Sequence, residues 1–253
     1  MTDDAADLIY GIHPVERVLE HSPRRVRVLW LAGTRGPLGS LFARARAAGV
    51  RVEVVDRRAL ERRVHGGVHQ GAVAQCHGAQ MADETELTAR LEGLDHPALV
   101  LALDGIQDPR NLGACLRCAE AAGVDAVVLP KRRSAPVTAV ARKTAAGAAE
   151  SLFLAEIGNL ARVLDRMKAG GLRIVGAAAD APSSWVDIDW TGPCMLAVGG
   201  EENGLRALTR AKCDALVAIP MAGEVASLNV SVATGILLFE AVRQRRDKRN
   251  PAH

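Results

Sequence analysis

The amino-acid sequence predicts an α/β protein that combines a C-terminal parallel-sheet domain with a smaller N-terminal α/β domain. Short, nearly continuous apolar runs alternate with helical stretches from residue 98 onward, which is typical of a parallel sheet covered by helices on both faces. A separate alternation of helix and strand occupies residues 1–78, and a polar, glycine-containing stretch follows it. The 253 residues are sufficient for two small domains. We therefore expect domains at 1–78 and 98–253, with a linker at 79–97.

The N-terminal domain is predicted to alternate helices with strands. Helical and strand patterns follow each other along this part of the sequence. The predicted helices are Pro14–His21, Leu38–Ala48 and Ala59–Val64, and the predicted strands are Val26–Leu31, Arg51–Val55 and Gly71–Cys76. In the linker only a short helix over Leu87–Leu91 is expected.

The C-terminal domain is predicted to contain more regular strands, with helices such as Leu112–Ala122 and Leu160–Lys168 between most of them. A final helix is expected from Leu228 to Arg246, and no internal repeat is visible. From periodicity alone the expected fold is an ordinary doubly wound sheet. The predicted strands are Ala98–Leu103, Ala126–Leu129, Leu152–Ala155, Arg173–Ala177, Met195–Val198 and Leu216–Ile219.

Polar segments follow three of these strands. The first reads Asp104-Gly-Ile-Gln-Asp-Pro-Arg-Asn-Leu-Gly-Ala-Cys-Leu-Arg117, and the second reads Gly199-Gly-Glu-Glu-Asn-Gly-Leu205. The third reads Ile219-Pro-Met-Ala-Gly-Glu-Val-Ala-Ser-Leu-Asn-Val-Ser231. A serine before a helix is usually only a cap, so the third segment alone would be weak evidence. Because ligands of open α/β sheets bind at the carboxyl ends of the strands, the three segments together predict a site there.

These segments, in this order, closely resemble the three motifs of the SpoU branch of the SPOUT methyltransferases, over about residues 98–246. Two N-terminal segments, Ile9-Tyr-Gly-Ile-His-Pro-Val-Glu16 and Val68-His-Gln-Gly-Ala72, resemble the RNA-binding domain of members that act on ribosomal RNA. The resemblance implies a deep trefoil knot and an N-terminal domain like ribosomal protein L30e. Periodicity does not predict the knot, since knots are essentially absent from proteins.

The same resemblance implies transfer of a methyl group from S-adenosylmethionine to the ribose 2'-hydroxyl of a guanosine in 23S rRNA. The implied nucleotide is position 2251, in the peptidyl-transferase region. Methylation of tRNA or of another rRNA site, including by a resistance methylase with both domains, is an alternative, although the N-terminal domain favours rRNA. A non-catalytic ribosome-assembly factor that binds RNA is another, against which the intact motif residues weigh. A homodimer with the active site at the subunit interface is also implied.

Five residues match the catalytic positions of the motifs: Asn111, Arg117, Glu201, Ser227 and Asn229. We expect Arg117 to bind an RNA phosphate beside the acceptor and to lower the pKa of the hydroxyl, because a guanidinium stays charged. Its alternative is an ordinary surface arginine. Asn111 is expected to cap its helix and to position the acceptor. Glu201 is expected to orient Arg117 or the Asn229 amide, or else to be an exposed loop acid, and Ser227 to hydrogen bond in the acceptor pocket.

The resemblance also implies the donor site. Backbone groups at Gly199, Ile219 and Leu228 are expected to hold the donor, with Ala197 and Met221 nearby. Core packing is the alternative for Ile219 and Leu228, and it is compatible with binding through their backbone.

The final helix carries one apolar face and a basic end. Leu228, Val232, Ile236 and Phe239 are spaced to share that face, which would be buried either between two subunits or within one. The tail Arg243–Arg249 is either an RNA contact or a solvated end.

Several other site types lack their signatures. No G-x-G-x-x-G occurs, which argues against a dinucleotide site. Gly199 and Gly204 have P-loop spacing, but Leu205 and Arg206 follow where Lys and Ser/Thr are required. No His–Asp pair accompanies Ser227, so a hydrolase triad lacks support. The seven histidines do not cluster with cysteines at ligand spacing, and no metal is expected.

Composition favours a cytoplasmic protein without a signal peptide or a membrane span. The five cysteines are scattered, which is typical of a reducing compartment, and Cys115 and Cys118 are interpreted as small buried side chains. Aromatic residues make up 3%, which limits stacking on RNA bases. Residues 1–78 contain 12 arginines against 8 acidic residues, an excess that serves either phosphate contacts or a solvated surface.

Overall fold

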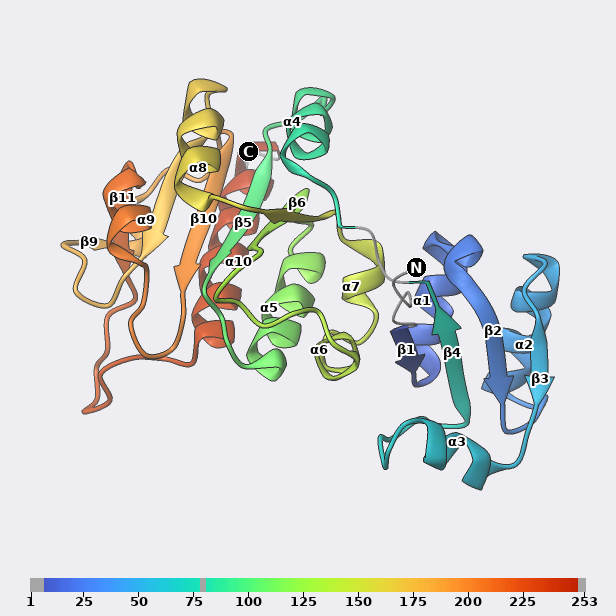
Figure 1. The fold of residues 1–253 in the computed structure, drawn as a ribbon. Helices are drawn as coiled ribbons and strands as arrows, with labels where there is room; N and C mark the ends of the chain where they lie inside the picture. The colour runs from blue at the N-terminus through green and yellow to red at the C-terminus, as the bar shows by residue number, and fades with distance from the viewer. Residues whose placement is uncertain (1–6, 78–80, 250–253) are drawn as a thin grey trace. The chain divides into compact units, whose positions relative to one another are not determined.

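The computed structural model describes residues 7–77 and 81–249, and its contacts divide the chain into two compact units. Unit 1 comprises Met1–Gln80 and Val137–Ser151, and unit 2 comprises Met81–Pro136 and Leu152–His253. Each unit has its own sheet flanked by helices (Figure 1), so the α/β class is confirmed. The grouping of 137–151 with unit 1 was not expected from the sequence. The predicted domain boundaries stay a prediction.

Unit 1 is built on a four-stranded mixed sheet with the order β1-β4-β2-β3. Strand β1 was not predicted from the sequence, because it is short and lies beside the helix that follows it. It pairs antiparallel with β4 along its whole length. The strands are β1 (Asp7–Tyr10), β2 (Val26–Leu31), β3 (Val52–Val54) and β4 (Ala72–Cys76), and the helices α1 (Ile12–His21), α2 (Pro37–Ala47) and α3 (Arg57–Arg63) connect them.

The two N-terminal segments singled out by the resemblance meet at one corner of unit 1. The Gly11 amide donates to the Ala72 carbonyl at 3.0 Å, and the Ile12 amide donates to Gln70 Oε1 at 3.1 Å. His69 is buried, and its Nδ1 accepts from the Gly71 amide at 3.0 Å. Burial lowers the pKa of His69, which favours the neutral form of its ring. The two segments, almost sixty positions apart in the sequence, are therefore hydrogen bonded to each other in unit 1.

A buried ion pair lies in the part of unit 1 that comes from the middle of the chain. Helices α6 (Ala139–Thr144) and α7 (Ala148–Ser151) carry Arg142 and Glu150, which pair in the interior. Arg25 Nη1 also donates to Glu150 Oε2 at 3.0 Å. Since Arg25 lies between α1 and β2, the Glu150 carboxylate links residues 139–151 to the N-terminal part of unit 1. Helical periodicity carries no information about such a distant partner.

Unit 2 is built on a seven-stranded sheet with the order β7-β6-β5-β10-β8-β11-β9, in which the paired strands are parallel. The six predicted strands are all present, and the two-residue β9 was not predicted. The predicted trefoil knot stays a prediction. The strands are β5 (Leu99–Asp104), β6 (Ala126–Pro130), β7 (Leu154–Ile157), β8 (Arg173–Ala177), β9 (Ser183–Ser184), β10 (Cys194–Gly199) and β11 (Ala215–Ala218).

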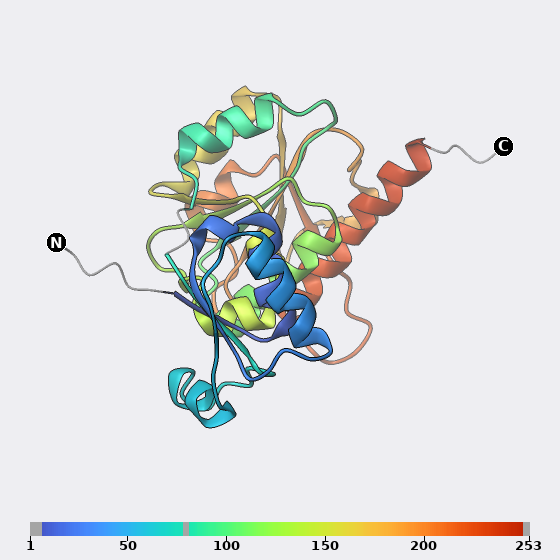
Figure 2. The same ribbon diagram turned by 90° about the vertical axis from the view of Figure 1, so that its right-hand side faces the viewer.

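Helices cover both faces of this sheet. Helix α4 (Glu84–Glu92) and helix α8 (Leu160–Ala169) share one apolar core with β5, β6 and β10, and Leu87 of the predicted linker is fully buried there. Helix α5 (Pro109–Ala121) and helix α10 (Val230–Arg249) pack on each other and lie side by side in Figures 1 and 2. Helix α9 (Ala207–Lys212) precedes β11. No helix within residues 7–77 and 81–249 has the length and apolarity needed to cross a bilayer.

Within one subunit, helix α10 buries a face other than the one that carries Val232 and Phe239. Thr234, Leu237, Leu238 and Ala241 are buried, whereas Val232 is 50% exposed and Phe239 is 49% exposed. Burial of the Val232–Phe239 face within one subunit is therefore wrong. The reason is that α5 packs on the opposite side of the helix, where Cys115 Sγ lies 3.7 Å from Thr234 Oγ1.

At the basic end of α10, the side chain of Arg245 forms hydrogen bonds within the protein. Arg245 donates to the carbonyls of Pro97 at 2.8 Å, Ala98 at 2.9 Å, Trp190 at 3.0 Å and Gly192 at 2.8 Å. For Arg245 the expectation of a freely solvated end is therefore wrong, and the RNA contact of the tail stays a prediction. This side chain ties the end of α10 to the segments that enter β5 and β10.

Candidate active site

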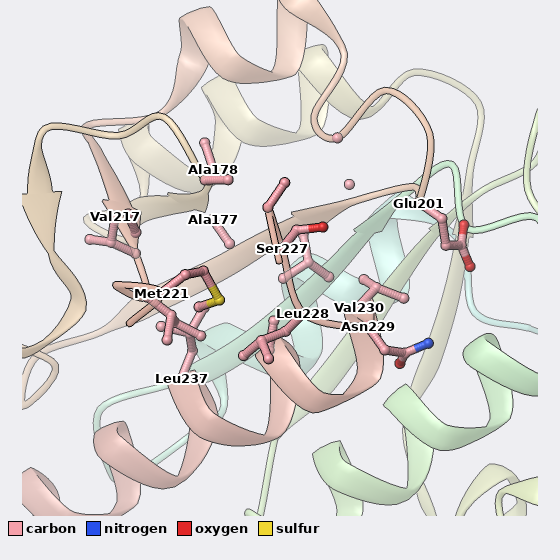
Figure 3. Close-up of a pocket in the computed structure, with 18 of the residues that line it drawn as sticks. Ala177, Ala178, Glu201, Val217, Met221, Ser227, Leu228, Asn229, Val230 and Leu237 are labelled. Carbon is pink, nitrogen blue, oxygen red and sulfur yellow. The ribbon is translucent and has the colours of Figure 1, made fainter. Parts of the chain in front are cut away.

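Unit 2 contains a cavity of about 850 Å³ at the carboxyl ends of β8, β10 and β11 (Figure 3). Parallel strands place their carboxyl ends at one edge, which is the usual ligand site of open α/β sheets. Four segments line the cavity: Ala177–Ala179, Val198–Glu201, Val217–Met221 and Val225–Val230. The second and third motif segments thus face each other across one space.

Four of the five residues predicted for the donor line this cavity: Gly199, Ile219, Met221 and Leu228. Ala197 does not line it, because its side chain is buried in the core shared with α4 and α8. The lining residues Ala177–Ala179 were not predicted. Their position could have been predicted, since Ala177 ends a predicted strand and Ala178 and Ala179 follow it at the same sheet edge.

The loop between β11 and α10 has free polar backbone groups. Within the part of the chain that the structure describes, the backbone of residues 220–228 forms no hydrogen bond to another residue. Peptide groups that lack partners are available to a ligand. The cavity therefore combines apolar side chains with backbone donors and acceptors, as expected for a site that reads a ligand through the main chain.

A chain of hydrogen bonds joins the three motif segments at one end of the cavity. Asn111 Nδ2 donates to Glu201 Oε1 at 2.5 Å, and Asn229 Nδ2 donates to Asn111 Oδ1 at 3.0 Å. Asn229 Oδ1 in turn accepts from the Ser231 amide at 2.9 Å. Three predicted catalytic residues from distant parts of the sequence are thus held in one network. In Figure 3, Glu201 and Asn229 lie toward one side of the cavity, and Met221 lies toward the other.

Two predicted roles within this network differ from the structure. The expectation that Asn111 caps its helix is wrong, because α5 begins at Pro109 and Asp108 accepts from the Arg110 amide at 2.8 Å. Glu201 accepts from Asn111 rather than from Arg117 or the Asn229 amide. Asn111 lies in the first turn of α5, so its amide is free to bridge the other two segments.

Arg117 and Ser227 lie outside the network. Arg117 is exposed on α5 and makes no hydrogen bond or ion pair with any residue in 7–77 or 81–249. Ser227 lines the cavity and is exposed. Both side chains are therefore available to a bound molecule.

A buried carboxylate fixes the loop that carries Glu201. Asp104, at the end of β5, is 1% exposed and accepts from the Arg206 amide at 3.0 Å and from Arg206 Nε at 2.5 Å. Its carbonyl accepts from the Gly200 amide at 3.2 Å. Residues 200–206 are thus held at both ends against β5. This anchoring fixes the position of the loop from which the Glu201 side chain reaches Asn111.

Replacing Arg206 with alanine is expected to lower the free energy of unfolding of unit 2 by about 3 kcal/mol, since it strands a buried carboxylate. The partial exposure of Arg206 keeps the effect near the low end for such pairs. Urea denaturation would measure it. Arg210→Ala is a matched control, because Arg210 pairs with an exposed Asp180 and its removal should cost less than about 1 kcal/mol. Equal effects in the two variants would contradict the role of the buried pair.

The cysteines of α5 are packing side chains, with Cys115 buried and Cys118 partly buried. Burial raises the pKa of Cys115 to about 12 and also raises the pKa of Cys118, so both thiols stay protonated at neutral pH. This agrees with their interpretation as packing residues. No cluster of His, Cys, Asp and Glu in the described ranges is arranged to hold a metal ion.

Similarity to known proteins extends over both parts of the chain. Residues 98–239 match the SpoU rRNA Methylase family, and residues 8–82 match the family described as RNA 2'-O ribose methyltransferase substrate binding. The first match contains all three motif segments, and the second contains both N-terminal segments.

Relatives and solved structures agree along nearly the whole chain. The 23S rRNA (guanosine-2'-O-)-methyltransferase RlmB of Pseudomonas putida is 49% identical over 243 residues, covering 95% of this chain and 98% of the relative. Its namesake in Escherichia coli K12 is 45% identical, covering 95% and 99%. The SpoU methyltransferase AviRb of Streptomyces viridochromogenes, in complex with AdoMet, superimposes with a TM-score of 0.80 at 26% identity, covering 95% and 90%. Because these similarities extend through the joined motifs and the N-terminal segments alike, the chain belongs to the SpoU rRNA methylase family.

Proposed function

We propose that this protein methylates the ribose 2'-hydroxyl of guanosine 2251 in 23S rRNA, with S-adenosylmethionine as methyl donor. The reaction class follows from the family, and relatives named as 23S rRNA guanosine methyltransferases align along 95% of the chain. That alignment includes the N-terminal substrate-binding region, which supports rRNA over tRNA. The particular nucleotide, in the peptidyl-transferase region, is the one that the motif resemblance implies.

The cavity fits this donor. Its apolar wall, which includes Leu228 and Leu237, suits an adenine ring, and the unpaired backbone groups of 220–228 can hydrogen bond the ring edge. Glu201 is the one charged side chain among the lining residues of the described chain, and a carboxylate favours a nearby sulfonium. When bound, S-adenosylmethionine supplies an electrophilic methyl group.

The chain's own residues align and activate the acceptor. The network of Asn111, Glu201 and Asn229 is already formed, so no side chain there must reorganise when RNA binds. The unpaired cation of Arg117 binds the phosphate beside the acceptor ribose and stabilises the negative charge that develops on its oxygen. Holding the two reactants in line supplies much of the rate, on the order of 7–11 kcal/mol in favourable cases.

We also propose that the protein acts as a homodimer in the cytoplasm. The support is the exposed apolar face of α10, where Val232 and Phe239 are each about half exposed. Such residues at helical spacing, next to the site, suit a second copy of the chain. A sedimentation mass of one subunit at micromolar concentration would contradict the dimer.

The test is to map 2'-O-methyl groups on total RNA from cells with and without the gene. Loss of the mark at position 2251 of 23S rRNA, restored by the wild-type gene, is expected. Loss of a mark only on tRNA, or at another rRNA position, would show that the substrate is that nucleotide and not position 2251. An unchanged methylation map would instead favour an RNA-binding assembly factor.

A further inference from the structure

Three consecutive cations form an exposed loop at the site's edge of the sheet. Lys131, Arg132 and Arg133, called here the basic loop, follow directly after β6 and are all exposed. None of their side chains makes a hydrogen bond or ion pair with any residue in 7–77 or 81–249. The sequence motifs give these three residues no role.

Several other cations of unit 2 are held differently. Each of these arginines pairs with a carboxylate, which leaves it little capacity for an external anion. The paired residues include Arg162 and Arg166 on Glu84, Arg206 on Asp104, Arg210 on Asp180 and Arg243 on Glu240. Three adjacent positive charges without acidic partners repel one another, and a polyanion relieves that repulsion.

The basic loop is anchored beside the first motif segment. The Ala135 amide donates to the Ile106 carbonyl at 2.7 Å, and a Cβ on Gly105 would lie 3.4 Å from the Arg133 carbonyl oxygen. Gly105 also lies close to Gly200 of the second segment. A Cβ added to Gly200 would lie 2.6 Å from the carbonyl oxygen of Gly105. The basic loop, the start of the Asn111 segment and the Glu201 loop are therefore successive neighbours along one edge.

We infer that the basic loop binds backbone phosphates of the RNA strand that carries the acceptor nucleotide. This inference rests on the proposed function and adds a second group of cations to the single cation of Arg117. Neither the loop nor its flanks carry an aromatic side chain, so the binding is to phosphate rather than to stacked bases. Phosphate binding supplies affinity and orientation, and it depends strongly on salt.

The test compares Lys131→Glu/Arg132→Glu with wild type, using 23S rRNA purified from cells that lack the gene. Filter binding over a range of salt concentrations should show an RNA Kd raised at least about tenfold. The slope of log K against log salt should become shallower by about 1 for each phosphate that the variant no longer binds. The Kd for S-adenosylmethionine should be unchanged, because neither residue lines the cavity.

Two variants serve as controls. Arg173→Ala removes a cation from the opposite, amino-terminal edge of the sheet and should leave RNA binding nearly unchanged. Arg132→Lys keeps the charge and should retain most of the affinity.

Equal RNA affinity and equal salt slope in the loop variant and Arg173→Ala would overturn the inference, whatever the methylation result. So would a defect confined to assembling ribosomal particles with normal binding to naked rRNA, since the loop would then bind a protein. If the wild-type protein binds 23S rRNA through the basic loop yet methylates none of it, the proposed function is contradicted while phosphate binding by the basic loop is supported.

Discussion

Replacing Arg117 with alanine is expected to lower kcat about 100- to 1,000-fold, the usual cost of removing one charge-stabilising group. Arg117 is exposed and makes no hydrogen bond or ion pair within the described chain, so its removal should leave the free energy of unfolding unchanged. It does not line the cavity, so the Kd for S-adenosylmethionine should also stay the same. Single-turnover methylation of rRNA, calorimetry with the donor and urea denaturation would measure the three quantities.

Arg117→Lys distinguishes charge from shape. Lysine keeps the positive charge but lacks the planar fork that binds phosphate through two donors, so partial recovery of kcat is expected. Arg173→Ala, at the far edge of the sheet, should turn over normally. Near-normal turnover by Arg117→Ala would remove this residue from the mechanism.

Replacing Gly199 with alanine is expected to distort the donor site and to destabilise unit 2. A Cβ on Gly199 would lie 1.9 Å from the carbonyl carbon of Gly204 and 2.1 Å from the Leu205 nitrogen. Both are backbone atoms, so no side-chain rotation relieves the overlap, and the decrease in stability should exceed the roughly 1–3 kcal/mol of ordinary overpacking. A displacement of even about 1 Å in this loop should lower kcat/KM by roughly 100-fold.

Gly158→Ala is the matched control for this prediction. An added Cβ at Gly158 meets no atom within 4 Å, and the backbone there is not left-handed, so little change is expected. Thermal or urea unfolding and donor calorimetry on both variants would check the contrast. If Gly199→Ala unfolded and bound donor like Gly158→Ala, the close backbone packing in this loop would be refuted.

Local patterns predicted most elements of unit 2, because most of its strands are apolar runs and its longer helices alternate with them. Local patterns did not predict elements whose position depends on contacts with residues far away in the sequence. Strand β1 is defined by pairing with β4, and residues 137–151 are placed by the burial of Glu150 against Arg25. No window of neighbouring residues contains both partners, so propensity could not identify them.

The candidate site shows the same division. Four residues predicted for the donor line the cavity, since strand ends are visible in the sequence, and Ala177–Ala179 line it without having been predicted. Asn111 was expected to cap a helix that Asp108 caps. The apolar face of α10 was recognised, but only packing against α5 shows that Val232 and Phe239 remain exposed.

The α/β class, the three polar segments at strand ends and the family could all be inferred from the amino-acid sequence, because they depend on residue types at short spacing. Three interactions became visible only in the folded chain. Asn111 bridges Glu201 and Asn229, Asp104 holds the Glu201 loop through Arg206, and Arg245 anchors the end of α10. Each of these interactions joins residues that strand order and helix packing bring together. Partner choice over such distances is a property of the assembled fold, and local periodicity does not encode it.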